Sequence, residues 1–286
     1  MSKIIVLAKQ VPDTANIRGK AMKDDGTVNR AALPAIFNPE DLNALEMALQ
    51  IREKTAWPVV LITMGPPKAI EVVKEALYRG ADEGYLVTDR KFAGSDTWAT
   101  SYILAAAIRK VGEARLVLAG RQAIDGDTAQ VGPQVAERLG FNQVTYVTAL
   151  NEVGGDYVIV ERDGEFQTEV IRAPMPVLLT VTATANNPRY PSARDMLRYF
   201  RADIAANIPP EKKEIYEQNG WIIPVIDFAA LDIDETLIGL KGSPTKVHAI
   251  KDIAFTGGSL KMYDPHVDGV KALVRDLLKE YVEVNS

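Results

Sequence analysis

The segment at 120–140, GRQAIDGDTAQVGPQVAERLG, contains the residue types that a phosphate-binding loop needs. Gly120, Gly126 and Gly132 allow close approach of a ligand or of another backbone segment, and a helix pattern begins after Thr128. Free amides at the start of a helix attract phosphate. Asp125 and Asp127 would repel phosphate, so we expect them to cap the helix or to hydrogen-bond a hydroxyl. The loop is consistent either with a nucleotide site or with a well-capped connection that binds nothing.

Other kinds of chemistry find little support in the residue types. The chain has no cysteine, which excludes disulfides, thiolate nucleophiles and cysteine-ligated iron–sulfur clusters. The two histidines, His248 and His266, have no companion ligands in the sequence, so neither a metal site nor a Ser/His/Asp set is predicted. Any redox chemistry would therefore depend on a bound organic cofactor.

The composition is that of a mildly acidic globular chain. With 286 residues, of which 47% are hydrophobic, the chain can bury one substantial core. Lys and Arg total 33 against 38 Asp and Glu, without a basic block, so no nucleic-acid partner is expected. The N-terminal apolar run stops at Lys9, too early for a signal peptide or a membrane span. We expect a soluble cytoplasmic protein.

Strand-length apolar runs alternate with helix patterns over the first 140 residues. The runs are apolar on both faces, which is typical of a buried parallel sheet. They cover 3–9, 58–65, 84–89 and 114–120. The helix patterns cover 39–54, 66–80, 95–112 and the segment that ends at Gly140. This order predicts an α/β fold with a doubly wound, mostly parallel sheet and a ligand outside the carboxyl ends of its strands.

Three loops at those carboxyl ends can converge on one ligand. They are LAKQVPD after the first run, TMGPP after the second and GRQAIDGDTAQVGP after the fourth. Asn38 and Asp41 stand at the start of the helix at 39–54, whose Pro39 and acidic residues suit a first turn. From the residues alone, Asn38 and Asp41 are explained equally well as helix caps, and Met64 as apolar filling.

The pattern changes after residue 140. Short β-branched segments with the turns VGGD and RDGE predict antiparallel strands at the sheet edge, the last of them being PVLLTVTATA. Residues 201–260 have little regular pattern, and a terminal amphipathic helix starts near Asp264. We therefore expect an α/β nucleotide-binding domain at 1–200 and an extended C-terminal arm at 201–286 that packs on a partner chain.

Several of these stretches, taken in order, carry a resemblance to a known family. VLAKQVPD, FNPEDLNALEMAL, TMGPPKAIEVVKEALYRGAD, LVLAGRQAIDGDTAQVGPQVAERLG and NNPRYPS resemble the small (beta) subunit of electron transfer flavoproteins over roughly residues 3–195. The resemblance implies a Rossmann-like α/β domain that binds a nucleotide. It also implies a heterodimer with a larger alpha subunit, whose mobile domain carries an FAD that shuttles electrons.

The family has two branches, which differ in what the small subunit binds. Housekeeping members hold a structural AMP and pass single electrons from acyl-CoA dehydrogenases to a quinone reductase. The bifurcating branch holds a second FAD, which accepts hydride from NADH and sends one electron downhill and one to ferredoxin or flavodoxin. DGDTAQVGP resembles the second branch, because housekeeping members typically carry an acidic residue in place of Gly126, Asn in place of Ala129 and Thr in place of Val131.

The resemblance also implies which residues hold the nucleotide. Backbone groups at Leu7 and Ala8 would meet the adenine, Asn38 and Asp41 would order the nearby loop or the ribose, and Thr128 would donate to the pyrophosphate. The expected cofactor-binding residues are Leu7, Ala8, Asn38, Asp41, Thr63, Met64, Gly65, Ala123, Asp127, Thr128, Ala129, Gln130, Val131 and Gly132. Arg162 in VIVERDGEF is a candidate for tuning the flavin ring, and its alternative is a surface charge on a strand.

The stretch PRYPSARDMLRYF corresponds to the family's docking loop for dehydrogenases. The expected docking residues are Arg189, Tyr190, Ala193 and Leu197. Ala193 stands where the family usually has a leucine anchor for acyl-CoA dehydrogenases. Either Leu197, Tyr199 or Phe200 replaces that anchor, or the partner is another flavoprotein, such as an FAD-linked 2-hydroxyacid dehydrogenase.

The favoured hypothesis is the small subunit of a bifurcating, NADH-oxidising electron transfer flavoprotein. Its main competitor is a one-electron carrier subunit with structural AMP. A third hypothesis is a nucleotide-binding regulatory protein that uses the same fold without redox work. The C-terminal arm and NNPRYPS argue against the third, because a self-contained module needs neither.

Overall fold

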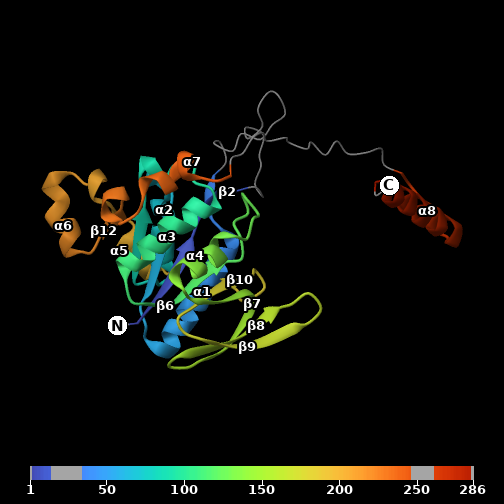
Figure 1. Ribbon diagram of the computed structural model, residues 1–286, viewed down its shortest axis with the longest axis horizontal. Coiled ribbons are helices and arrows are strands. Elements are labelled where there is room, and N and C mark those ends of the chain that lie inside the picture. Colours follow the sequence, from blue (N-terminus) through green and yellow to red (C-terminus); the bar gives the residue numbers. More distant parts are fainter. Residues whose placement is uncertain (1, 14–33, 246–260, 285–286) are drawn as a thin grey trace.

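A nine-stranded sheet runs through the protein, with helices on both of its faces (Figure 1). The computed structural model describes residues 2–13, 34–245 and 261–284. The strand order is β13-β5-β4-β1-β6-β10-β7-β8-β9. The strands are β1 Lys3–Ala8, β4 Val59–Met64, β5 Glu83–Val87, β6 Ala114–Gly120, β7 Asn142–Val153, β8 Tyr157–Asp163, β9 Thr168–Pro174, β10 Val177–Val181 and β13 Val225–Ile226. The predicted doubly wound, mostly parallel α/β fold is confirmed.

Four helices pack in pairs on opposite faces of the sheet. Helices α1 (Pro39–Thr55) and α2 (Ile70–Arg79) share one buried cluster with the strands, and α3 (Thr97–Val111) and α4 (Val131–Leu139) share the other. Successive strand residues alternate between the two clusters: Ile4 of β1 belongs to the first and Ile5 to the second. Because both faces are covered, the central strands must be apolar on both sides.

Helix boundaries follow the capping signals in the sequence. Helix α1 begins at Pro39. Helix α2 ends at Arg79, and its C-cap Gly80 has a φ of +111°, in the left-handed region that favours glycine. Asp96 accepts a hydrogen bond from the Ala99 amide at the start of α3. These three boundaries were predictable because each depends on residues next to it in the sequence.

The prediction of antiparallel edge strands after residue 140 is right for β8 and β9 and wrong for β10. Strand β8 pairs antiparallel with β7 and β9. Strand β10 instead lies between β6 and β7 and runs parallel to both. All five residues of β10 are buried, which is the property of an interior parallel strand. The continuous apolar sequence of β10 is thus a better guide to its place in the sheet than the alternating segments that precede it.

Residues 203–245 lie on the same domain. Strand β13 adds to the large sheet beside β5, and Ile223, Ile226, Leu231 and Ile238 are buried in the two clusters. The remaining elements are β2 Gln10–Pro12, β3 Ala35–Phe37, α5 Ala193–Tyr199, β11 Asp203–Ile204, α6 Lys213–Gln218, β12 Ile222–Ile223, α7 Gly239–Gly242 and α8 Val267–Val284. Figure 1 places α8 apart from the α/β domain. Within the described ranges, no helix is both long and apolar enough to cross a membrane.

Candidate functional site

The strand order reverses between β1 and β6. From β1 the chain passes through α1 to β4 and β5 on one side, whereas β6 and β10 lie on the other side. In doubly wound sheets, ligands bind at such a reversal, outside the carboxyl ends of the strands. The loops after β1 and β6 meet here, where Lys9 Nζ lies 2.7 Å from Asp125 Oδ1. This edge is therefore the candidate site.

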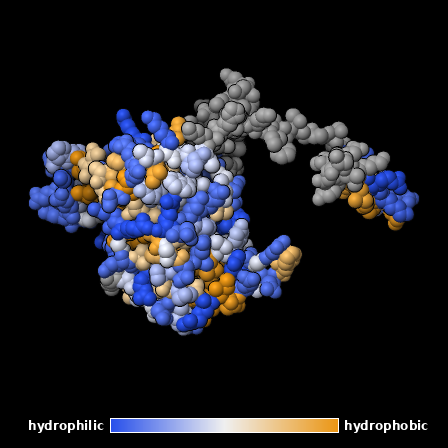
Figure 2. All heavy atoms as spheres, viewed as in Figure 1, coloured by the Kyte–Doolittle hydropathy of each residue, from blue (hydrophilic) through white to orange (hydrophobic). Residues whose placement is uncertain are grey.

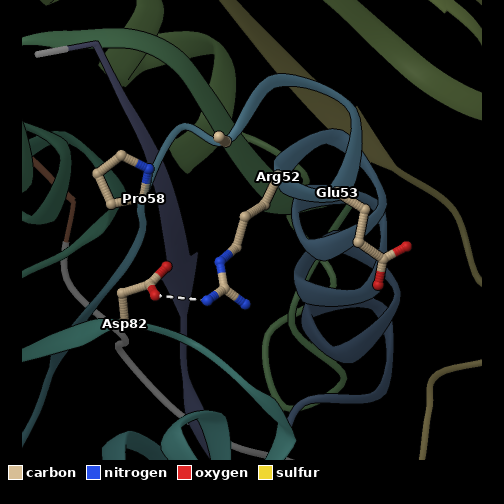
Figure 3. A pocket seen from close by; sticks show the side chains of 5 residues that line it. Arg52, Glu53, Pro58 and Asp82 are labelled. Atoms are coloured by element: carbon tan, nitrogen blue, oxygen red, sulfur yellow. Dashed lines mark hydrogen bonds and ion pairs between the residues drawn. The ribbon is translucent and has the colours of Figure 1, made fainter.

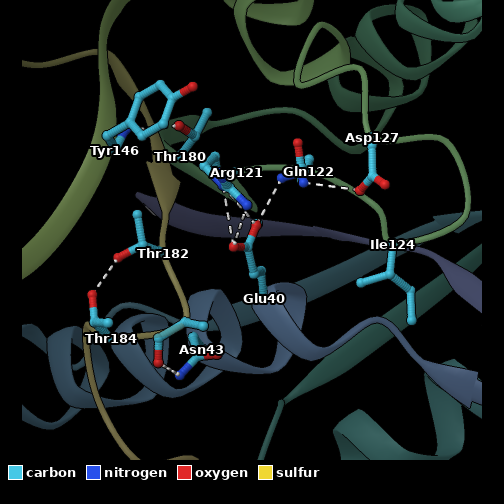
Figure 4. Close-up of polar contacts among 12 residues, drawn as sticks. Glu40, Asn43, Arg121, Gln122, Ile124, Asp127, Tyr146, Thr180, Thr182 and Thr184 are labelled. Atoms are coloured by element: carbon cyan, nitrogen blue, oxygen red, sulfur yellow. Dashed lines mark hydrogen bonds and ion pairs between the residues drawn. The ribbon is translucent and has the colours of Figure 1, made fainter. Parts of the chain in front are cut away.

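Polar side chains at the start of α1 hold the loop after β6 (Figure 4). Asn38 Oδ1 accepts a hydrogen bond from the Ile124 amide at 3.1 Å, and Asn38 Nδ2 donates to the Gln122 carbonyl at 2.9 Å. Glu40 accepts from the Gln122 amide at 3.0 Å and pairs with Arg121 at 3.1 Å. Asn38 makes no side-chain capping bond to α1, so its helix-cap explanation is wrong. Its side chain orders the neighbouring loop.

Asp41 connects the carboxyl ends of β1 and β6. Its oxygens accept hydrogen bonds from the Lys9 amide at 2.8 Å and the Gly120 amide at 2.9 Å. Burial raises the pKa of Asp41 to about 7, although these hydrogen bonds lower it. Gly120 permits the contact, since a Cβ there would lie 2.4 Å from Asp41 Oδ1. Asp41 therefore positions the two loops relative to each other.

Backbone amides around the start of α4 are free among the described residues, including those of Ala129, Gln130 and Val131. Ala129 has a left-handed φ of +52°, and Gln130 returns to right-handed values of φ −98° and ψ −32°. Such alternation points successive N–H groups toward one place and creates an anion site. In the part of the chain that the structure describes, the amides of Ala129, Gln130 and Val131 donate no hydrogen bond, and α4 has no side-chain cap. They are available to a phosphate group.

The two aspartates of the loop leave these amides free. Asp125 is paired with Lys9, and Asp127 Oδ1 accepts a hydrogen bond from Gln122 Nε2 at 2.9 Å. Neither caps α4, so the capping alternative is wrong for both. Within the described ranges, a Cβ added at Gly126 would meet nothing within 4 Å, so no described side chain fills the space beside it.

The other expected cofactor residues lie along the same edge. Leu7 and Ala8 end β1, Thr63 and Met64 end β4 next to them, and Gly65 follows. Ala123 and the exposed Thr128 follow β6 in the loop. Gly132 packs closely against β10, since an added Cβ would lie 2.8 Å from the Thr180 side chain. The Thr63 hydroxyl is buried and has no hydrogen-bond partner among the described residues. The structure thus brings the three expected loops to one edge.

Arg162 lies at the same edge, farther along the sheet. Across the sheet, Gly120 of β6 pairs with Val181 of β10. Val181 pairs in turn with Val147 of β7, and Val147 pairs with Arg162 of β8. Three strand spacings, about 14 Å, therefore separate Arg162 from β6. Its guanidinium lies 3.8 Å from Glu169, and its Nε is buried and finds no hydrogen-bond partner in the part of the chain that the structure describes.

Sequence reasoning missed two residues at this edge, Tyr146 and Arg121. The Arg121 guanidinium lies 5.7 Å from the centre of the Tyr146 ring, and Figure 4 shows the two side by side. Arg121 belongs to the 120–132 loop, whose glycines and aspartates, and not its arginine, indicate a ligand site in the sequence. Tyr146 carries no local signal, because its position depends on how β7 pairs with β10.

A sequence model of the electron transfer flavoprotein domain matches residues 25–217. The chain belongs to the electron transfer flavoprotein family. The electron transfer flavoprotein subunit beta of Thermoanaerobacterium thermosaccharolyticum is 47% identical over 86% of each chain. The caffeyl-CoA reductase-Etf complex subunit CarD of Acetobacterium woodii is 42% identical, covering 97% of this chain and 98% of the relative. The acryloyl-CoA reductase electron transfer subunit gamma of Anaerotignum propionicum is 39% identical, covering 98% and 95%. The resemblance stated from the sequence is confirmed.

The expected docking residues of this electron transfer flavoprotein chain fall into two groups. Arg189 is used within the chain, since its guanidinium donates to Glu46 at 2.8 and 3.0 Å and to Glu53 at 2.8 Å. Tyr190 and Leu197 are 91% and 74% exposed, and Ala193 is exposed at the start of α5. Arg189 therefore fastens the expected docking segment, residues 187–200, to α1, while the other side chains remain accessible.

A separate cavity of about 410 Å³ lies beside the C-terminal end of α1 and the start of β4 (Figure 3). Arg52, Glu53, Ala56, Pro58 and Asp82 line it. Arg52 donates to Asp82 at 2.7 Å, and Asp82 accepts from the Val59 amide at 2.9 Å. Its charged groups are already paired, and it lies at the sheet edge opposite the candidate site, so we assign it no ligand.

Proposed function

We propose that this chain, the beta subunit of an electron transfer flavoprotein, binds FAD at the loop after β6 and accepts electrons there from NADH. The observation that carries the proposal is the group of three free amides at Ala129, Gln130 and Val131, beside the uncapped start of α4. They suit the negative charge of a pyrophosphate. FAD, when bound, supplies hydride acceptance and the transfer of single electrons.

The protein's own residues bind and orient such a cofactor. Asn38 and Asp41 fix the loop that carries the free amides. In this proposal the exposed Thr128 hydroxyl would donate to the pyrophosphate, and the backbone at Leu7 and Ala8 would meet the adenine. The cation at Arg162 lies toward the far end of the site, where it would favour negative charge on the ring.

The relatives support a bifurcating role. Two of them are named as a subunit of a caffeyl-CoA reductase complex and as an electron transfer subunit of an acryloyl-CoA reductase. For the present chain we propose an alpha subunit with its own FAD, an acyl-CoA dehydrogenase-like or FAD-linked 2-hydroxyacid dehydrogenase, and ferredoxin or flavodoxin as the low-potential acceptor. The heterodimer would act in the cytoplasm.

Two exposed apolar surfaces support this set of partners. One lies on the docking segment, at Tyr190 and Leu197. The other is one face of α8, where exposed apolar residues recur every three or four positions. Its members are Val267, Val270, Val274, Leu277 and Leu278. Figure 2 shows hydrophobic atoms on one side of this helix and hydrophilic atoms on another. We assign the first surface to the dehydrogenase and the second to the alpha subunit.

Structural AMP is the second candidate ligand, because the three amides at 129–131 suit one phosphate as well as two. Nucleotide released from the denatured heterodimer distinguishes the candidates. We expect two FAD per heterodimer, with flavin bleaching on addition of NADH. One FAD and one AMP, without a response to NADH, would contradict the proposal.

A charge substitution tests the placement of the pyrophosphate. Thr128→Glu should reduce bound FAD at the beta-subunit site by at least about tenfold, because a carboxylate would face the phosphate charge. Thr128→Gln has nearly the same size without the charge and serves as the control. Stoichiometric FAD in the Thr128→Glu heterodimer would show that the pyrophosphate lies elsewhere.

A further inference from the structure

Tyr146 occupies an unusual backbone position. Two residues of β7, Thr145 and Tyr146, lie opposite the single Thr180 of β10, which makes a β-bulge. Tyr146 has a φ of +59°, a left-handed value that is costly for a bulky side chain. Its amide donates to the hydroxyl of the buried Thr180 at 3.1 Å. The surrounding structure therefore maintains a strained conformation, which is a mark of functional positions.

This conformation leaves the Tyr146 ring 40% exposed beside a fixed cation. The Arg121 guanidinium lies 5.7 Å from the ring centre. Glu40 holds Arg121 at 3.1 Å and also accepts the Gln122 amide at 3.0 Å, so the cation is tied to the nucleotide loop (Figure 4). An exposed tyrosine ring next to a guanidinium is a good surface for a planar, electron-rich ligand.

The place of Tyr146 along the sheet relates it to the ligand. A dinucleotide whose pyrophosphate binds at 129–131 must extend in both directions from the strand-order reversal. On the β4 side the edge is formed by Met64 and Gly65. On the other side, past β6 and β10, β7 presents the exposed ring of Tyr146. Among the described residues of this edge, Tyr146 offers the ring that one half of the dinucleotide can stack on.

We propose that Tyr146, with Arg121 behind it, forms the surface against which the flavin ring lies, and that it selects FAD over AMP. The inference rests on the proposed function, since it requires FAD at this loop. AMP ends at its phosphate and does not reach β7. Tyr146 therefore contributes to the binding of FAD and not to the binding of AMP.

The test compares FAD and AMP titrated separately into the full heterodimer after removal of nucleotide from the beta-subunit site. Tyr146→Gly removes the ring and relieves the left-handed strain. We expect roughly tenfold weaker FAD binding, as for the loss of one stacking and cation contact, with AMP affinity unchanged. Tyr146→Phe keeps the ring and should retain FAD affinity. Ala56→Gly relieves a similar φ of +57° away from the site and should change neither affinity.

The outcomes separate this inference from the proposed function. Equal losses of FAD and AMP affinity in Tyr146→Gly would show a general structural role and overturn the inference. Unchanged FAD affinity would also overturn it, with the proposed function left intact. A wild-type complex that binds AMP but no FAD would overturn both.

Discussion

Asp41 is subject to two opposing conditions. It faces two backbone N–H donors, which favour the carboxylate, and it is buried, which favours the neutral acid. Burial has the larger effect, and the pKa of Asp41 rises from 3.8 to about 7. Asp41 joins the two loops of the candidate site, and its ionisation near neutral pH lowers the stability of the folded protein.

This balance predicts a pH dependence of folding. Because the folded pKa lies above the unfolded value, the folded state binds more protons between about pH 4 and pH 7. The contribution of Asp41 is fully present below pH 4 and is lost as the pH rises through 7. Relative to Asp41→Asn, the wild-type free energy of unfolding should fall by up to about 1.4 kcal/mol per pH unit in this window. Urea unfolding at several pH values measures it, and a constant difference would contradict the assignment.

Gly120 provides a second prediction for single residues. A Cβ at Gly120 would lie 2.4 Å from Asp41 Oδ1 and 2.8 Å from backbone atoms of α1, so Gly120→Ala should lower the free energy of unfolding by about 1–3 kcal/mol. Gly126→Ala is the matched control, because its Cβ would meet nothing within 4 Å. Thermal or urea unfolding of both variants measures the difference. Equal stability of the two variants would mean that α1 shifts to accommodate the added Cβ at little cost in free energy.

At the scale of elements, α1 is the part on which the site is assembled. Its first turn holds the loop after β6, and its outer side holds the docking segment through Glu46 and Arg189. The Glu46 side chain is 8% exposed, whereas Glu53, the other partner of Arg189, is 60% exposed. The pKa of Glu46 is lowered, because its bonds to Arg189 outweigh the effect of burial.

We therefore expect replacement of Glu46 and replacement of Glu53 to have unequal effects on stability. Glu46→Ala should destabilise the protein by about 1–3 kcal/mol, since it leaves Arg189 without its buried partner. Glu53→Ala should change stability by less than about 0.5 kcal/mol. Hydrogen exchange of residues 187–192 should increase in the first variant only. Similar exchange in both would show that Arg189 does not fasten the docking segment.

Local signals explain how much of the fold and the site could be predicted. The helix starts at Pro39 and Asp96 and the glycines of the 120–132 loop act through neighbouring residues, so their roles were visible in the sequence. The bond from the Gly120 amide to Asp41 joins residues 79 positions apart. The bulge at Tyr146 likewise depends on the insertion of β10 beside β7. Such long-range contacts are set by packing, which a sequence pattern does not display.

At the scale of the whole molecule, the C-terminal third divides into two parts. Residues 203–245 complete the α/β domain, and α8 lies apart from it. A chain that ends after Thr245 should keep its melting temperature within about 2 °C and pair more weakly with the alpha subunit.

A chain that ends before Val225 should not fold, because it lacks the buried side chains of Ile226, Leu231 and Ile238, each worth about 2–5 kcal/mol. Calorimetry and affinity measurements check both. Undiminished pairing of the longer chain would exclude α8 as the contact.

Strand β13 has a further consequence for how the protein is made. It covers the outer edge of β5, and the Phe228 amide that follows it donates to Asp89, 139 positions earlier in the chain. During synthesis the N-terminal strands leave the ribosome long before this cover exists. The growing chain therefore carries an open strand edge, which invites pairing with other nascent chains. Chaperone binding to this edge during translation would keep the early sheet monomeric until β13 arrives.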